Sequence, residues 1–123
     1  MQTAGRSPAA DQRVVPVGAH DHRLGLALAL AEVDPAHHDA ILARGRAYGE
    51  SRLVCNVHWQ SDIIEGRFMG AAVVSQEHGV AEFRADIEAA RHELAEARAK
   101  KLAPDRDCAA EAEALTQKIP GVL

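Results

Sequence analysis

Aromatic side chains are scarce in this 123-residue chain, where one Trp, one Tyr and two Phe make up 3% of the residues. Aromatic and β-branched residues pack best in sheets, whereas the abundant alanines of this chain favour closely packed helices. The sequence contains no strand pattern and no internal repeat. It therefore predicts an all-α fold, a helical bundle of one domain at most with a modest core.

Three further absences exclude classes of function. No apolar run is long enough to span a bilayer, and no signal peptide opens the chain. The formal net charge of −4 leaves no basic footprint for a nucleic acid partner. The two cysteines, Cys55 and Cys108, have no metal-ligand spacing, and we interpret them as buried or free thiols.

The apolar pattern divides the chain into three parts. Residues 1–26 are expected to form an irregular arm, because residues 1–23 lack an apolar period. Residues 104–123 form a tail with one short helix around residues 109–118. The middle part, residues 27–103, is the helical domain. The helices expected before the tail cover residues 24–33, 35–54, 58–78 and 80–102, and the second of them has Asp34 as its N-cap and Pro35 at its first position.

Small and apolar residues indicate how these helices pack. Gly66, Gly70 and Ala71 are expected to let a neighbouring helix approach closely. One stripe of the fourth long helix is apolar, and an i,i+4 ion pair lies outside it. The stripe consists of Phe83, Ile87, Ala90 and Leu94, and the pair is Glu96 with Lys100.

The stretch from Ser51 to Asp62 carries the candidate chemistry: Arg52, His58 and Asp62. His58 and Asp62 share a helix face if a helix begins near His58. The carboxylate can then hold the Nδ1–H group and leave Nε2 basic, which prepares an imidazole nucleophile. Arg52 reaches the same place only if the helix is interrupted between the two residues. Asn56 can end the helix there, because asparagine tolerates a left-handed conformation. The stretch predicts an oxyanion pocket at a helix N-terminus.

The pattern Ser-Arg, five residues, His, three residues, Asp resembles the third signature of the type 2 phosphatidic acid phosphatase and vanadium haloperoxidase superfamily. The flanking residues 48–52 and 57–62 look most like bacterial class A non-specific acid phosphatases, and the resemblance runs from about residue 27 to about residue 97. It implies that residues 27–103 form a partial acid phosphatase/haloperoxidase-like core. It also implies a periplasmic location, although the chain as written would be cytoplasmic.

The resemblance further implies a phosphohistidine mechanism on phosphate monoesters, with inorganic phosphate as the product. His58 matches the nucleophile, Asp62 its orienting partner and Arg52 a phosphate ligand. No metal and no other cofactor is implied, because positive side chains stabilise the charge.

The other two signatures are incomplete. The first (Lys, six residues, Arg-Pro) is absent, and the sequence upstream is too short to contain it. The second, Pro-Ser-Gly-His, falls in register on residues 16–19, where Ala19 replaces the acid histidine. His20 comes one residue late, a rotation of roughly 100° on a helix. We therefore expect a truncated form with impaired catalysis. The alternative is a non-catalytic helical remnant or interaction module.

A change of reading frame accounts for the missing second signature. Permitted codons for residues 17–25, read one base forward, spell Ser-Gly-His-Thr-Thr-Ile-Gly-Trp. We hypothesise that residues 1 to about 26 are translated out of frame. The nucleotide sequence of the gene tests this, and a shifted frame that does not spell Pro-Ser-Gly-His rejects it.

Three alternatives remain open. His20, His22, His37 and His38 are either surface histidines or a metal site. The stretch 52–62 can also be read as a helix-end His–Asp contact with a surface arginine. The apolar stripe of the fourth long helix, if it stays uncovered, predicts self-association and a homo-oligomer.

Overall fold

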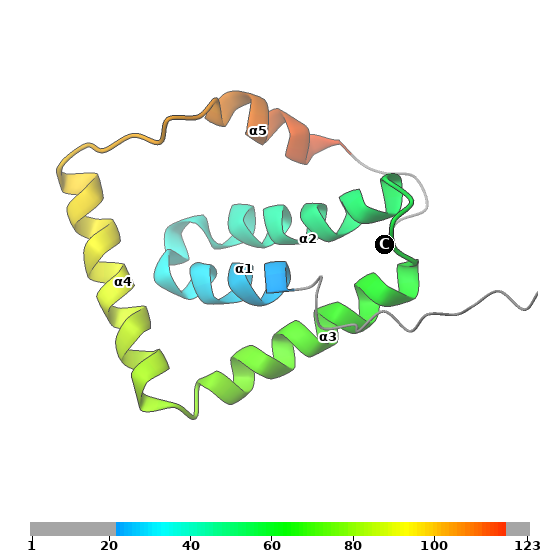
Figure 1. Ribbon diagram of the computed structural model, residues 1–123. Coiled ribbons are helices and arrows are strands. Elements are labelled where there is room, and N and C mark those ends of the chain that lie inside the picture. Colours follow the sequence, from blue (N-terminus) through cyan, green and yellow to red (C-terminus); the bar gives the residue numbers. More distant parts are fainter. Residues whose placement is uncertain (1–21, 118–123) are drawn as a thin grey trace, which may run out of the picture.

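The computed structural model describes residues 22–117, which form five α-helices and one short 3-10 helix and contain no strand (Figure 1). The elements are α1 (His22–Val33), η2 (Pro35–His37), α2 (His38–Val54), α3 (Gln60–Glu77), α4 (Ala81–Ala99) and α5 (Cys108–Thr116). The prediction of an all-α fold is confirmed. Most of the expected arm, with Ala19 and His20, lies outside the described residues.

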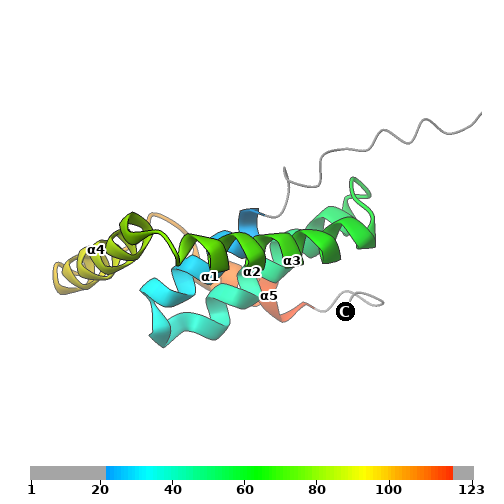
Figure 2. The same ribbon diagram turned by 90° about the horizontal axis from the view of Figure 1, so that it is seen from below.

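Three helices form one packed unit, and the other two lie around it. α1 and α2 run antiparallel side by side, α3 crosses α1, and α5 returns over α2 (Figure 1). Seen from below, α4 extends away from the three-helix unit formed by α1, α2 and α3 (Figure 2). No helix within the described range has both the length and the apolar character needed to cross a lipid bilayer.

Glycines set the distances between helices in the three-helix unit. A Cβ added at Gly45 of α2 would lie only 2.6 Å from the Cβ of Ala27 on α1. A Cβ added at Gly25 of α1 would lie 3.5 Å from the carbonyl oxygen of Gly70 on α3. The expectation that Gly70 permits a close helix approach is therefore confirmed. Because small residues bring the backbones together, dispersion contacts between backbones replace contacts between large side chains.

The apolar core of the described residues is small. Its buried apolar members are Ala27, Ala31, Ile63 and Ile87, and no large side chain in residues 22–117 is completely enclosed. Gly45, Gly49 and Gly66 are buried beside them. The sequence analysis anticipated a modest core but not the role of Gly45 and Gly49, because a glycine adds nothing to an apolar pattern.

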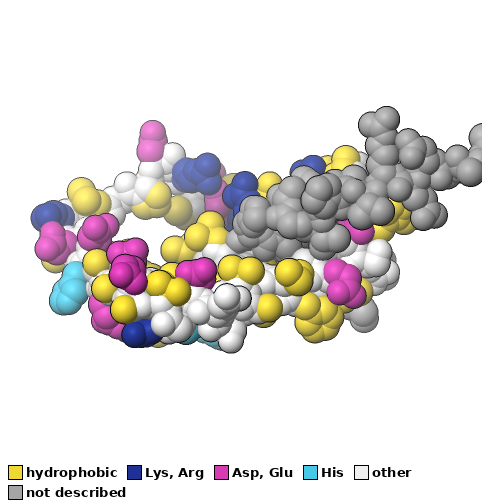
Figure 3. All heavy atoms as spheres, turned by 60° about the horizontal axis from the view of Figure 1, so that its bottom comes forward, with side chains coloured by type: hydrophobic (Ala, Val, Ile, Leu, Met, Phe, Trp, Pro, Cys, Tyr) yellow, Lys and Arg dark blue, Asp and Glu magenta, His cyan; other side chains and the backbone are white. Residues whose placement is uncertain are grey.

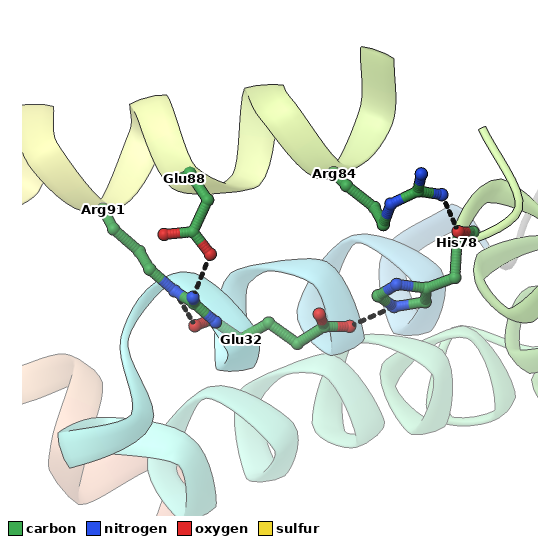
Figure 4. Close-up of polar contacts among 5 residues, drawn as sticks. All are labelled: Glu32, His78, Arg84, Glu88 and Arg91. Atoms are coloured by element: carbon green, nitrogen blue, oxygen red, sulfur yellow. Dashed lines mark hydrogen bonds and ion pairs between the residues drawn. The ribbon is translucent and has the colours of Figure 1, made fainter. Parts of the chain in front are cut away.

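A set of polar contacts joins α4 to α1, and we call it the α4 seam (Figure 4). Glu32 lies at the end of α1. Its carboxylate is 2.8 Å from His78 Nε2, and its backbone carbonyl accepts a hydrogen bond of 2.9 Å from Arg91 Nε. Arg84 donates to the His78 carbonyl, and Arg91 also pairs with Glu88. The seam therefore joins α1, the end of α3 and α4.

The rest of α4 agrees with the sequence pattern. Ile87 is buried, and Phe83, Ala90 and Leu94 are half-buried on the same side. Lys100 Nζ lies 3.2 Å from Glu96 Oε2, so the expected ion pair is confirmed.

Asp34 does not act as the side-chain cap that the sequence predicted. It precedes the 3-10 helix η2, but its carboxylate makes no cap hydrogen bond. Instead the carboxylate accepts from Arg98 of α4 and contacts His37 Nδ1 at 2.9 Å. The Arg98 guanidinium lowers the pKa of Asp34, His37 adds to this effect, and desolvation opposes it. A charged donor supplied from 64 residues away therefore wins over a backbone N–H group.

Candidate functional site

The turn after α2 is a Schellman motif centred on Asn56. Asn56 has φ 53°, and its N–H donates to the Leu53 carbonyl at 2.9 Å. The Val57 N–H donates to the Arg52 carbonyl at 3.1 Å. These two bonds and one left-handed residue define the motif. The prediction that Asn56 breaks the helix in a left-handed conformation is confirmed, and the turn brings the peptide just before His58 against the backbone of Arg52.

His58 and Asp62 meet at the start of α3. The His58 Nδ1 atom lies 3.5 Å from Asp62 Oδ2, and the His58 side chain is only 11% exposed. α3 begins at Gln60, two residues after His58, which agrees with the expectation of a helix starting near His58. Trp59, whose extended backbone has ψ 157°, is the N-cap residue. The pair forms although His58 precedes the helix.

Asp62 also has a structural role. Its Oδ2 atom accepts the Trp59 N–H at 2.9 Å, which satisfies a donor at the helix start. The same oxygen therefore faces the His58 ring and fixes the first turn of α3. Both the predicted orienting partner and the alternative helix-end contact are compatible with this geometry.

Arg52 lies in the last turn of α2 and is half-buried. Its side chain makes no hydrogen bond or ion pair with any residue in the described range 22–117. The Schellman motif puts Arg52 and His58 at the same helix junction. That the guanidinium and the ring converge on one anion stays a prediction.

An exposed apolar rim surrounds the junction. Trp59 is 80% exposed, Val54 63% and Val57 52%. The sequence analysis did not identify this rim, and the only signal for it was three apolar residues close to His58 in the predicted turn. The most exposed member of the rim, Trp59, directly follows the largely enclosed His58 in the chain.

Two further histidines, His37 and His38, contact neighbouring carboxylates. His37 contacts Asp34 and lies beside Arg98, and His38 Nδ1 lies 3.1 Å from Asp39. Among the residues that the structure describes, no group of three or more His, Cys, Asp or Glu side chains could hold a metal ion. His20 lies outside this range. Cys55 and Cys108 are exposed free thiols.

Comparison with known proteins gives a consistent set of relatives. The chain is 46% identical over 80 residues to the acid phosphatase of Zymomonas mobilis subsp. mobilis, which covers 65% of this chain and 30% of that protein. It is 39% identical over 69 residues to a non-specific acid phosphatase of Providencia stuartii, covering 56% of this chain and 28% of that protein. A non-specific acid phosphatase of Salmonella typhimurium is 36% identical over 69 residues, with the same two coverages.

The chain thus spans less than a third of the length of these relatives. No family model matches it. No solved structure matches it either. The relatives support a resemblance to acid phosphatases over more than half of this chain.

Proposed function

We propose that the junction of α2 and α3 is part of a phosphate monoester site of the class A acid phosphatase kind, within the type 2 phosphatidic acid phosphatase and haloperoxidase superfamily. The observation that carries this proposal is the His58 Nδ1 atom 3.5 Å from Asp62 Oδ2 at the start of α3. The similarity to proteins named acid phosphatase supports it. A periplasmic location belongs to the same proposal and is tested by fractionating cells that express the chain.

His58 is the proposed nucleophile. The ring nitrogen that does not face Asp62 attacks phosphorus, so that a P–N bond forms and the bond to the leaving oxygen breaks. The leaving alkoxide takes a proton from solvent water, and a second water then attacks phosphorus, breaks the P–N bond, releases inorganic phosphate and restores the imidazole. Asp62 holds the ring and stabilises the positive charge that it acquires on phosphorylation.

Arg52 and the start of α3 are the proposed phosphate ligands. A guanidinium presents paired donors to phosphate oxygens, and the N-terminus of a helix favours negative charge. Within the described range, the backbone N–H groups of Gln60 and Ser61 make no hydrogen bond to the protein. They are therefore suited to donate to the same anion as Arg52, with no metal ion required.

Catalysis by these 123 residues is expected to be weak. The matched signature supplies one guanidinium, and Ala19 stands where the second signature has its acid histidine. Loss of a single oxyanion donor commonly costs about 10²–10³ in turnover, and here several groups are missing. We expect phosphate binding with little turnover.

Binding is tested first, because it does not depend on turnover. The chain has a single tryptophan, Trp59, so its fluorescence reports on the junction. We expect a saturable change with inorganic phosphate and with phenyl phosphate. Arg52→Ala should weaken binding at least about tenfold, because a charged hydrogen bond is lost. Arg106→Ala removes an arginine that pairs with Glu111 away from the junction and serves as the matched control.

Two results of the titration would reject the site. One is the absence of any saturable response. The other is equal weakening by Arg52→Ala and Arg106→Ala, since that would point to nonspecific attraction of anions.

Turnover is tested with p-nitrophenyl phosphate at acidic pH. We expect hydrolysis near the background rate, unaffected by a metal chelator. Robust turnover that disappears in His58→Ala would contradict the impaired catalysis and establish an active phosphatase. Turnover that persists in His58→Ala would instead contradict the role of the imidazole.

The second candidate function is a non-catalytic helical interaction module. The observation that favours it is the outer side of α3, where Phe68, Met69 and Val73 are all more than half exposed. This candidate needs no catalytic role for His58, because Asp62 already has a capping role.

A further inference from the structure

The outer stripe of α3 is largely apolar, and no other residue in the described range 22–117 buries it. We define it as the residues at i, i+3, i+4, i+7, i+8 and i+11 on the exposed side, namely Glu65, Phe68, Met69, Ala72, Val73 and Gln76. Phe68 is 66% exposed, Met69 55% and Val73 53%. Figure 3 turns the bottom of Figure 1 forward and shows hydrophobic side chains on this face among acidic and other side chains. Four of the six exposed positions are therefore apolar, and these four are neighbours on the helix surface.

This arrangement differs from that of an ordinary surface helix. All seven residues from Phe68 to Val74 are apolar, so this segment of α3 has no polar face. A helix that is apolar all round is normally covered on every side. Here Ile63 and Gly66 are buried on the inner side, while the opposite side stays open. The stripe is therefore suited to contact with another apolar helix.

The stripe is complementary to itself when two copies run antiparallel. With the symmetry axis midway between Met69 and Ala72, Phe68 of one copy lies opposite Val73 of the other, and Met69 lies opposite Ala72. Each large side chain then meets a smaller one, as close packing requires.

The polar ends of the stripe fit the same direction. In the antiparallel arrangement Glu65 lies opposite Gln76 of the second copy, so a carboxylate meets an amide donor. In a parallel arrangement Glu65 would lie opposite Glu65, and like charges would repel. Charge and size therefore both select the antiparallel direction.

We propose that the outer stripe of α3 is the interface of a symmetric homodimer in which two α3 helices pack antiparallel. Such an interface uses the same patch on both copies and closes on itself. A standard interface takes about 800 Å² from each partner, which is more than one short stripe offers. The dimer is therefore concentration-dependent, with a dissociation constant in the micromolar range or weaker.

The experiment measures the monomer–dimer equilibrium of the full chain by analytical ultracentrifugation over a concentration series. Met69→Glu puts a charge into the apolar contact and should weaken dimerisation at least about tenfold. Leu102→Glu makes the same kind of change at an apolar side chain that is 68% exposed and lies beyond α4, so it is the matched control and should have no effect. Both positions are exposed, and circular dichroism checks that helix content is unchanged.

A second variant tests the direction of packing. In Met69→Glu combined with Ala72→Lys, the new carboxylate of one copy faces the new ammonium of the other, twice per antiparallel dimer. We expect this double variant to recover most of the affinity lost in Met69→Glu. In a parallel dimer the new carboxylates would lie together, and no recovery would follow.

Four outcomes would overturn the proposal. The chain could be monomeric at every concentration, in which case the stripe serves another partner. Met69→Glu could leave the dimer intact. Leu102→Glu could weaken association as much as Met69→Glu, as expected for unspecific aggregation. Failure of the double variant to recover affinity would reject the antiparallel register.

Discussion

The three-helix unit and the α4 seam hold helices together in opposite ways. In the three-helix unit, Gly45 and Ala27 bring two backbones so close that one extra carbon would collide. In the α4 seam, Glu32, His78 and Arg91 bridge the helices through long side chains that remain partly exposed. The first interface depends on shape, whereas α4 combines its apolar side, on which Ile87 is buried, with charge and hydrogen bonds.

The difference teaches where the molecule tolerates change. A close-packed contact between backbones cannot relax, so it is sensitive to a single methyl group and insensitive to salt. Exposed ion pairs contribute little individually and are screened by salt. We therefore expect α4 to detach before the three-helix unit unfolds. The following predictions test this contrast.

The largest effect is expected from Gly45→Ala. The added Cβ would lie 2.6 Å from the Cβ of Ala27, and the resulting overpacking should lower the free energy of unfolding by about 1–3 kcal/mol. This loss exceeds the gain of up to about 1 kcal/mol from better helix propensity. Urea denaturation measures the change.

Gly25→Ala is the matched control for this prediction. Its Cβ would meet the Gly70 carbonyl oxygen at 3.5 Å, an ordinary contact, so helix propensity should dominate. We expect no loss of stability, or a gain of about 0.5 kcal/mol. Equal destabilisation by both substitutions would contradict the claim that the contact between Ala27 and Gly45 is the one that cannot accept an added methyl group.

A smaller effect is expected from Arg91→Met, which keeps the aliphatic stem and removes the hydrogen bond to the Glu32 carbonyl. The loss should be about 1 kcal/mol and should appear as faster amide hydrogen exchange in α4 rather than in α2. Arg106→Met serves as the control, because Arg106 lies between α4 and α5 in the chain and pairs with Glu111 rather than with a residue of the α4 seam. Uniform acceleration of exchange in all helices would argue against a separate α4 seam.

Asp34→Asn should change the pH dependence of stability. Arg98 lowers the pKa of Asp34 in the folded chain, so the stabilisation is fully present above the unfolded value of about 4 and is lost as the pH falls through the folded value. The wild type should therefore be more stable than the variant at pH 7, and the difference should vanish at about pH 2. Parallel stability curves across this range would show that the ion pair adds nothing.

The smallest effect is expected from Glu96→Gln. The pair with Lys100 is exposed and follows the i,i+4 rule, so about 0.3–0.5 kcal/mol is at stake. Added salt at about 1 M should erase the difference between wild type and variant. A change of more than about 1 kcal/mol would mean that Glu96 has a tertiary role.

The helices could be predicted from the sequence because their ends are marked locally. Asn56 ends α2 through its own left-handed conformation and its neighbours, and the Glu96–Lys100 pair is local as well. The true partner of Asp34 could not be predicted, because Arg98 reaches it only after α4 has folded back. Local rules therefore gave Asp34 a capping role that a distant guanidinium removes.

The candidate site was predictable to a similar degree. The spacing of His58 and Asp62 anticipated a contact that the structure contains, and α3 begins at Gln60, close to the expected start near His58. The position of the Arg52 guanidinium relative to the ring depends on side-chain torsions, which no spacing rule fixes. The exposure of Trp59 depends on which helices cover the junction, and this is a property of the whole fold.

One oxygen of Asp62 serves two purposes, since it faces the His58 ring and binds the Trp59 N–H group. An aspartate at position 62 is therefore useful to α3 whether or not the His58 ring takes part in chemistry. Replacing His58 would leave the helix start intact, whereas replacing Asp62 would disturb both the ring and the first turn of α3.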